Sequence, residues 1–235
     1  MGFNGTVVDV EDVVAAPAPV PVERLRDRFL ALSARYTLGI VQAAAWCLRL
    51  GPLTLIDFGE PRTRSGSVTW PIAGGLLVAA PGGELHVGWT EGRLRGGLRG
   101  YRPLLPIPLY DLTQRPLHRA LTRLALLQLR GREPLPGEPA SERARMLATG
   151  IDLALCAALS RRRPRAFPAV YAAYHLAAWS LAGGTLGGAL LGLRVKAVDG
   201  SRVTPPQAVV RLVAGDRAAG TAVVRAPAAP RPPRA

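Results

Sequence analysis

The sequence is short of lysine and of cysteine, so almost all of its positive charge is arginine and a disulfide framework is not expected. Lys196 is its only lysine, although lysine and arginine together number 30 and the formal net charge is +14. Cys47 and Cys156, its two cysteines, lie far apart inside apolar stretches, so they predict neither a disulfide framework nor a metal site. The chain has 235 residues, of which 49% are hydrophobic, and it can therefore bury a sizeable core instead of remaining disordered.

Recognisable catalytic chemistry is also missing. The three histidines, His86, His118 and His175, are scattered, and none lies at metal-ligand spacing from another histidine, a cysteine or a carboxylate. The sequence contains no nucleophile elbow and no phosphate-binding loop with its lysine. We therefore expect a protein that is not an enzyme, with no catalytic residue, no metal and no cofactor.

The excess of arginine needs an anionic partner, which is either nucleic acid or a lipid surface. Aromatic residues make up 6% of the chain and do not alternate with the basic clusters, so nucleic acid is not expected. The expected partner is a lipid bilayer with anionic headgroups. Arg115, Arg119 and Arg123 form a basic stripe on a predicted helix over 112–130, which would lie on a membrane surface. The alternative is a surface helix that packs its leucines on a sheet.

Composition divides the chain into four segments. Residues 1–21 predict a disordered lead-in, 22–135 an α+β domain, 141–215 a helical region and 216–235 a disordered basic tail. The α+β domain should begin with a helix over 22–50 and end with the basic helix, with an antiparallel β-meander of short strands between them, at 53–58, 67–72, 76–79, 84–90 and 93–101. This order is analogous to that of small lipid- or ligand-binding α+β folds.

The run from Ala166 to Leu193 contains no Asp, Glu, Lys or Arg, and it predicts a membrane helix. At about 1.5 Å per residue, such a helix would exceed the ~30 Å hydrocarbon core of a bilayer. A shorter apolar run, Met146–Ser160, precedes it, and a basic turn separates the two. The pattern predicts a membrane helical hairpin with both termini in the cytoplasm; the alternative is a buried hairpin in a globular core.

Several motifs in the second half, taken in order, resemble one family. They are Arg145-Met-Leu-Ala-Thr-Gly-Ile-Asp152, Gly184-Thr-Leu-Gly187, Leu190-Leu-Gly-Leu-Arg-Val195, Asp199-Gly200 and Gln207-Ala-Val-Val-Arg211. Together they resemble the RDD family of bacterial membrane proteins, over about residues 143–213. Gly188-Ala189 stands where that family usually has Lys-Arg. The resemblance implies an integral membrane protein with a transport-associated role and an unknown ligand. The implied signature residues are Arg145, Asp152, Gly184, Gly187, Arg194, Asp199, Gln207 and Arg211.

Two expectations concern individual positions. Arg145 and Asp152 are two helical turns apart, so Asp152 would point into the bundle toward a cationic or hydroxyl partner while Arg145 reaches the headgroups. The glycines between Gly183 and Gly192 form small-x-x-x-small pairs, which would let helices approach closely and support self-association.

The sequence thus predicts an α+β protein: an N-terminal helix, an antiparallel β-meander and an amphipathic helix, followed by an α-helical membrane hairpin. The predicted function is that of a non-enzymatic integral protein of the bacterial inner membrane, with its N-terminal domain in the cytoplasm. The alternative is a soluble or peripheral protein whose α+β domain binds a lipid-like ligand.

Overall fold

A computed structural model describes residues 6–226. Within this range the chain divides into two compact units, and the division falls between Gly131 and Arg132. Each unit has its own sheet and its own helices, so each is described separately.

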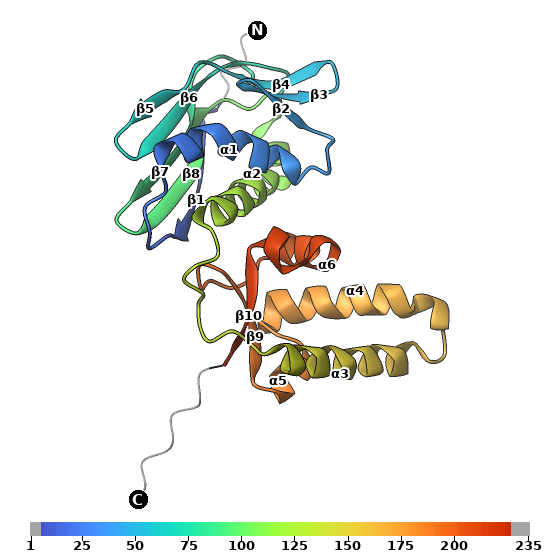
Figure 1. Cartoon of the computed structure of the whole chain (residues 1–235). Coiled ribbons are helices and arrows are strands. Elements are labelled where there is room, and N and C mark those ends of the chain that lie inside the picture. Colours follow the sequence, from blue (N-terminus) through green and yellow to red (C-terminus); the bar gives the residue numbers. More distant parts are fainter. Residues whose placement is uncertain (1–5, 227–235) are drawn as a thin grey trace, which may run out of the picture. The chain divides into compact units, whose positions relative to one another are not determined.

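The first unit is an eight-stranded antiparallel sheet with two helices (Figure 1). The strand order is β1-β8-β7-β6-β4-β3-β2, and β5 pairs with β6. The strands are β1 (Val8–Ala15), β2 (Gln42–Ala44), β3 (Cys47–Leu50), β4 (Leu53–Phe58), β5 (Arg62–Arg64), β6 (Ser67–Gly74), β7 (Glu84–Thr90) and β8 (Arg93–Tyr101). The helices are α1 (Val22–Arg35) and α2 (Ile107–Arg130).

The core of this unit lies between the sheet and the two helices, which lie side by side (Figure 1). Leu25 and Phe29, four residues apart and so on one face of α1, are both buried. The Phe29 ring stacks on Trp70 of β6, with 6.2 Å between the ring centroids. Leu124 and Leu127 form the corresponding buried face of α2. The apolar spacing of both helices is thus explained by one shared core.

Strands β4, β7 and β8 have the bounds that the sequence pattern predicts. Strand β6 is two residues longer than predicted and α2 begins five residues earlier, and two other segments differ more. Residues 76–79 form a turn with one isolated bridge, between Val78 and Pro103. The helix predicted over 22–50 ends at Arg35. The Thr37 hydroxyl lies 2.7 Å from the Ala34 carbonyl oxygen, to which it donates, and accepts from the Val41 N–H at 2.9 Å. These bonds close a turn that sends the chain into the β2–β3 hairpin.

Parts of the two segments predicted to be disordered form regular secondary structure. Within the predicted lead-in, Val8–Ala15 forms β1, which pairs with β8 along its length. Within the predicted basic tail, residues 216–219 belong to a helix and Thr221–Arg225 forms a strand. The rest of both predicted segments, residues 1–5 and 227–235, lies outside the described residues.

The second unit consists of a helical hairpin, three short helical elements, one longer helix after them, and a two-stranded sheet. Its elements are α3 (Glu142–Ser160), η1 (Pro164–Ala166), α4 (Phe167–Ala177), the π-helical turn η2 (Ala178–Ala182), α5 (Leu186–Leu190), β9 (Leu193–Ala197), α6 (Pro205–Ala219) and β10 (Thr221–Arg225). Helices α3 and α4 lie antiparallel, and β9 pairs with β10 beside them (Figure 1).

No helix within residues 6–226 is long and apolar enough to cross a membrane. The predicted membrane hairpin is therefore wrong, and so are the integral-membrane function and the cell-membrane location that depended on it. The physical reason lies in the uncharged run. Gly183 adopts a left-handed conformation (φ 69°) that ends η2, and Thr185 then caps a new helix, α5, by accepting from the Gly188 N–H. The run is thus broken into short elements.

The same break changes the role of the glycine cluster, because Gly183 and Gly187 do not belong to one helix. Gly187 packs instead against α3: a Cβ at this position would overlap with the carbonyl oxygen of Ala148. Gly150 on α3 has only open space around the corresponding position. Close packing therefore requires glycine at position 187 but not at position 150.

The two glycines predict opposite effects of the same substitution. Gly187→Ala should lower the free energy of unfolding of the α3–α5 region by about 1–3 kcal/mol, because the added methyl group has no space. Gly150→Ala should raise it by about 0.5–1 kcal/mol, because alanine is the better residue in an exposed helix. Hydrogen exchange of the α3 amides measures both, and equal effects would contradict the packing described.

Candidate functional site

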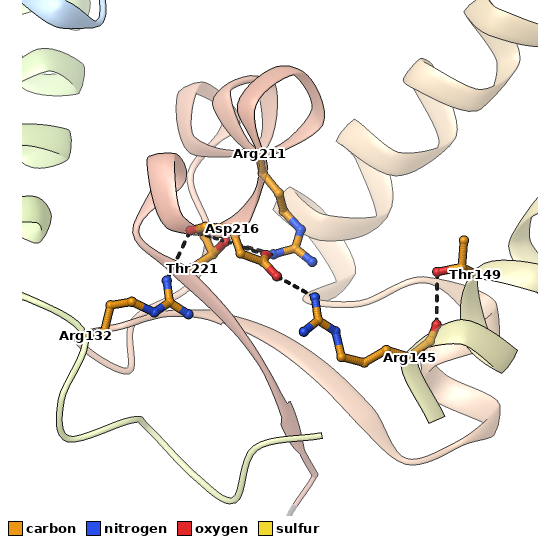
Figure 2. Close-up of polar contacts among 6 residues, drawn as sticks. All are labelled: Arg132, Arg145, Thr149, Arg211, Asp216 and Thr221. Carbon is orange, nitrogen blue, oxygen red and sulfur yellow. Dashed lines mark hydrogen bonds and ion pairs between the residues drawn. The ribbon is translucent and has the colours of Figure 1, made fainter. Parts of the chain in front are cut away.

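Three arginines from different parts of the second unit converge on Asp216 (Figure 2). Arg145 of α3 donates to its Oδ2 at 2.9 Å, and Arg211 of α6 forms an ion pair with its Oδ1. Arg132 donates to its main-chain oxygen at 3.4 Å. The Thr221 hydroxyl, at the start of β10, lies 3.1 Å from Oδ1 and donates to it. One carboxylate thus connects α3, α6 and β10.

Gly215 makes the pairing of Asp216 with Arg211 possible. In a regular helix, two residues five apart point in different directions, since each residue turns the chain by about 100°. Gly215 has φ 81° and ψ −179°, which kinks α6 immediately before Asp216. Only glycine adopts this conformation without strain. The kink turns Asp216 back, so that its carboxylate meets the guanidinium of Arg211.

Arg211 is a buried cation with an incomplete set of partners. Its side chain is 10% exposed, and its guanidinium lies over the Trp179 ring, 4.6 Å from the centroid. It also donates to the Thr221 hydroxyl at 2.8 Å, whereas its Nε–H has no acceptor among the described residues. Burial, together with the charges of Arg145 and Arg132, lowers the pKa of Arg211 to about 10. The guanidinium is still charged at neutral pH and remains short of acceptors.

A cavity of about 130 Å³ lies beside this cluster. Its polar wall includes Arg145, Arg211 and Asp152, and its apolar wall includes Trp179 and Val195. For comparison, an engineered protein cavity of about 150 Å³ holds a benzene molecule. The space therefore fits a small molecule, or one end of a larger one.

Asp152 has the hydroxyl partner that the sequence predicts, but in a different setting. The side chain is buried, and its Oδ1 accepts from the Tyr174 hydroxyl at 2.8 Å and from the Gly187 N–H at 2.9 Å. Burial and the neighbouring carboxylate raise the pKa of Tyr174 to about 12, so it donates at neutral pH. Arg145 does not reach toward headgroups as expected; it pairs with Asp216.

The remaining predicted signature residues mostly hold the backbone in place. Gln207 is fully buried and connects the two ends of α6, with its Nε2 donating to the Ala219 carbonyl at 3.2 Å. Asp199 closes a turn by accepting from the Ser201 N–H, and Arg194 donates to the Ala182 carbonyl. Gly184 lines the cavity. Of the eight residues, the structure therefore brings Arg145, Asp152, Gly184 and Arg211 to one cavity.

The site also contains residues that the sequence pattern did not single out, above all Asp216, Trp179 and Thr221. Asp216 did carry a signal, because it is the only acidic residue after Asp199 in a segment rich in arginine. A lone carboxylate among arginines is a strong candidate for an ion pair. Trp179 and Thr221 had no such signal, since Trp179 contacts Arg211 from a distant segment and Thr221 meets Arg211 and Asp216 only because β10 folds back beside α6.

The predicted basic stripe lies on α2, in the first unit. Arg115 pairs with Asp111 at 3.2 Å, and Arg123 pairs with Asp12 of β1 at 3.1 Å. Together with the buried leucines of the same helix, these pairs fit the alternative of a helix that packs on a sheet.

The first unit has an apolar cavity of about 60 Å³ between the sheet and its two helices. Its lining includes Phe29, Leu98 and His118. The Tyr110 hydroxyl lies 3.3 Å from Nδ1 of His118, and burial lowers the pKa of His118 to about 4. This volume is less than half that of the engineered cavity of about 150 Å³ that holds benzene, so it gives no support for a lipid-like ligand.

Comparisons of the chain with family models, with curated proteins and with solved structures find no match. Membership of the RDD family therefore stays a prediction. Within residues 6–226 there is also no group of three His, Cys, Asp or Glu side chains that could hold a metal ion. The case for function rests on the geometry around Asp216.

Asp216→Asn should lower the free energy of unfolding by about 2–4 kcal/mol, because it leaves the buried Arg211 without its carboxylate. Glu138→Gln removes the same formal charge from an exposed pair, 3.9 Å from Arg225, and should cost less than about 0.5 kcal/mol. Urea unfolding of both variants checks this. A similar loss in the two would mean that Asp216 does not organise the unit.

His118 predicts a pH dependence of stability. Because its folded pKa of about 4 lies below the ordinary 6.5, the unfolded chain binds more protons between these values. Stability should therefore fall by about 1–3 kcal/mol as the pH drops from 6.5 toward 4. His118→Asn, which does not titrate in this range, should show a smaller fall; His175 titrates in both proteins and serves as the internal control. Parallel stability curves for the two proteins would contradict the assignment.

Proposed function

We propose that this chain is a non-enzymatic ligand-binding protein whose second unit holds a small ligand through an oxyanion, either a carboxylate or a phosphate group. The observation that carries the proposal is the state of Arg211. It is nine-tenths buried, its Nε–H has no acceptor among the described residues, and two other arginines lie close enough to lower its pKa. A bound oxyanion would supply acceptors and negative charge at this point.

The charges around the cavity support an anionic ligand. The guanidinium groups of Arg145 and Arg211 pair with the carboxylate of Asp216, and that of Arg132 donates to the main-chain oxygen of the same residue. The second carboxylate of the cavity, Asp152, already accepts two hydrogen bonds at one oxygen. Even when both carboxylates are counted, one positive charge is left over, and it lies in a partly buried place where charge is weakly screened.

The shape of the cavity supports a small ligand with an apolar part. Arg145 and Arg211 come from two helices and share the carboxylate of Asp216, so N–H groups of both remain for a second oxyanion. The lining also contains Trp179, Leu193 and Val195, which suit an aliphatic or aromatic group. This proposal differs from the ligand-binding alternative drawn from the sequence, which placed a lipid-like ligand in the α+β domain.

Binding is favoured over catalysis because the titratable groups at the cavity already have structural partners. Asp152 accepts from Tyr174 and Gly187, and Nδ1 of His175 lies 2.9 Å from the Tyr171 carbonyl oxygen. Burial also lowers the pKa of His175. Oδ2 of Asp152 and Nε2 of His175 still have lone pairs, but the described residues that line the cavity include no cysteine, serine or lysine for such a base to activate.

Calorimetric titration with inorganic phosphate, and separately with benzoate, tests the proposal. The wild-type chain should bind at least one of them. Arg145→Gln and Arg211→Gln should weaken that binding by roughly ten- to hundredfold, because each removes a charged hydrogen bond. Arg145 is half-exposed, so its variant should stay folded even if the Arg211 variant does not.

Arg202→Gln is the matched control, because it removes an equal charge from an exposed position of the same unit. It should leave the affinity unchanged. Absence of binding of both anions to the wild type, or an equal loss in the control variant, would overturn the proposal.

A further inference from the structure

Helix α3 differs from an ordinary amphipathic helix in which residues it buries and which it exposes. Its buried positions recur every four residues and are small or polar: Ala148, Asp152, Cys156 and Ser160. Its large apolar side chains point outward instead. Met146 is 74% exposed, Leu147 62% and Leu159 64%. A helix in water normally buries such residues, so this surface is suited to contact with something apolar.

The exposed apolar surface continues on α5, which packs against α3 (Figure 1). Leu186 and Leu190 of α5 are both exposed, and so are Leu147 and Leu159 of α3. A single exposed leucine is common on protein surfaces, whereas a group on two adjacent elements indicates a contact surface. We call this surface the α3–α5 face. It is formed by the stripe Leu147, Ile151, Leu155 and Leu159 of α3, of which Ile151 and Leu155 are half-buried, together with Leu186 and Leu190 of α5.

The turn that joins α3 to α4 gives this region a strong positive charge. Arg161, Arg162, Arg163 and Arg165 are all exposed, and none forms an ion pair with another described residue. Between Arg143 and Val198 the only acidic residue is Asp152, which is buried. The region therefore presents exposed arginines and leucines and no exposed acid.

We propose that the α3–α5 face and the arginine turn dock flat on an anionic lipid surface, without any segment crossing it. The arginines would contact lipid phosphates, and the leucines would enter the boundary between headgroups and acyl chains. The positive charge of the arginine turn complements the negative charge of the lipid phosphates, and the apolar face beside it suits the acyl chains. This proposal does not depend on the oxyanion cavity.

A second copy of the chain is the less favourable occupant of this face. Each copy would bring the same unpaired arginine turn and the same +14 net charge, so two copies would repel each other. An anionic lipid surface neutralises the turn and accepts the leucines at the same time. Self-association is therefore treated as an outcome that the experiment must detect.

The test is co-sedimentation of the full chain with vesicles. The wild type should bind vesicles of phosphatidylcholine mixed with phosphatidylglycerol and bind pure phosphatidylcholine weakly, with affinity falling as salt is added. Replacing Arg161, Arg162 and Arg163 together by Gln should weaken binding roughly a hundredfold, at the usual contribution of one arginine near such a surface. Replacing Leu147 and Leu159 by Gln should weaken binding at every salt concentration.

Matched variants in the first unit control for general effects of charge and hydrophobicity. Arg24, Arg28 and Arg35, all exposed, are replaced together by Gln, and the exposed Leu53 and Leu104 are replaced by Gln. Both control variants should bind vesicles like the wild type. The phosphate and benzoate titrations should be unaltered in the α3–α5 variants, so the two proposals can fail separately.

Three results would overturn the proposal. They are equal binding to the two kinds of vesicle, equal losses in the control variants, and a dimer in light scattering that the Leu147 and Leu159 replacements abolish. The last result would assign the face to a second copy of the chain.

Discussion

The pairing of Asp216 with Arg211 is the interaction on which the second unit depends. Through this pair, the end of α6 is connected to α3 by Arg145 and to β10 by Thr221. The guanidinium of Arg211 also lies over the ring of Trp179, which connects α6 to η2. The pair exists because Gly215 interrupts α6 one residue earlier. Without the kink, Asp216 and Arg211 would point in different directions, and a buried guanidinium would have no counter-charge.

This pairing is incomplete, and its incompleteness matters for function. Desolvation of Arg211 is costly, and one shared carboxylate returns only part of that cost while Arg132 and Arg145 add repulsion. A structure built for stability alone would place a second acid here or an apolar residue. A partly satisfied cation beside a cavity is instead the arrangement in which a ligand can stabilise the folded state, since an anion that binds only the folded chain adds to its stability by mass action.

The parts of the fold that sequence could predict are those set by local pattern. Strands β4, β7 and β8 follow from short apolar runs between turn residues, and their bounds match. The helix over 22–50 failed because apolar residues continue at helical spacing past Arg35, while the turn around Thr37 is closed by hydrogen bonds that spacing does not show. At the site, Arg145, Asp152 and Arg211 were found from a motif, whereas Asp216 and Trp179 were missed. Asp216 pairs with Arg211 only because Gly215 kinks the helix between them, and Trp179 contacts Arg211 from a distant segment; helical periodicity records neither.

The uncharged run from Ala166 to Leu193 was read as a crossing segment because it is apolar and long, but length along the chain is not length along one helix. Gly183 divides the run, so its apolar residues are distributed over α4, η2, α5 and the first residue of β9. The absence of charge nevertheless has a consequence in three dimensions. Polar groups such as Asp152 and Arg211 occupy the interior of the unit, and leucines of α3 and α5 occupy its surface. An interior of this kind can hold an anion, and a surface of this kind needs an apolar neighbour. Both proposals therefore draw on one feature, the unusual composition of α3, whose buried positions are small or polar and whose large apolar side chains are exposed.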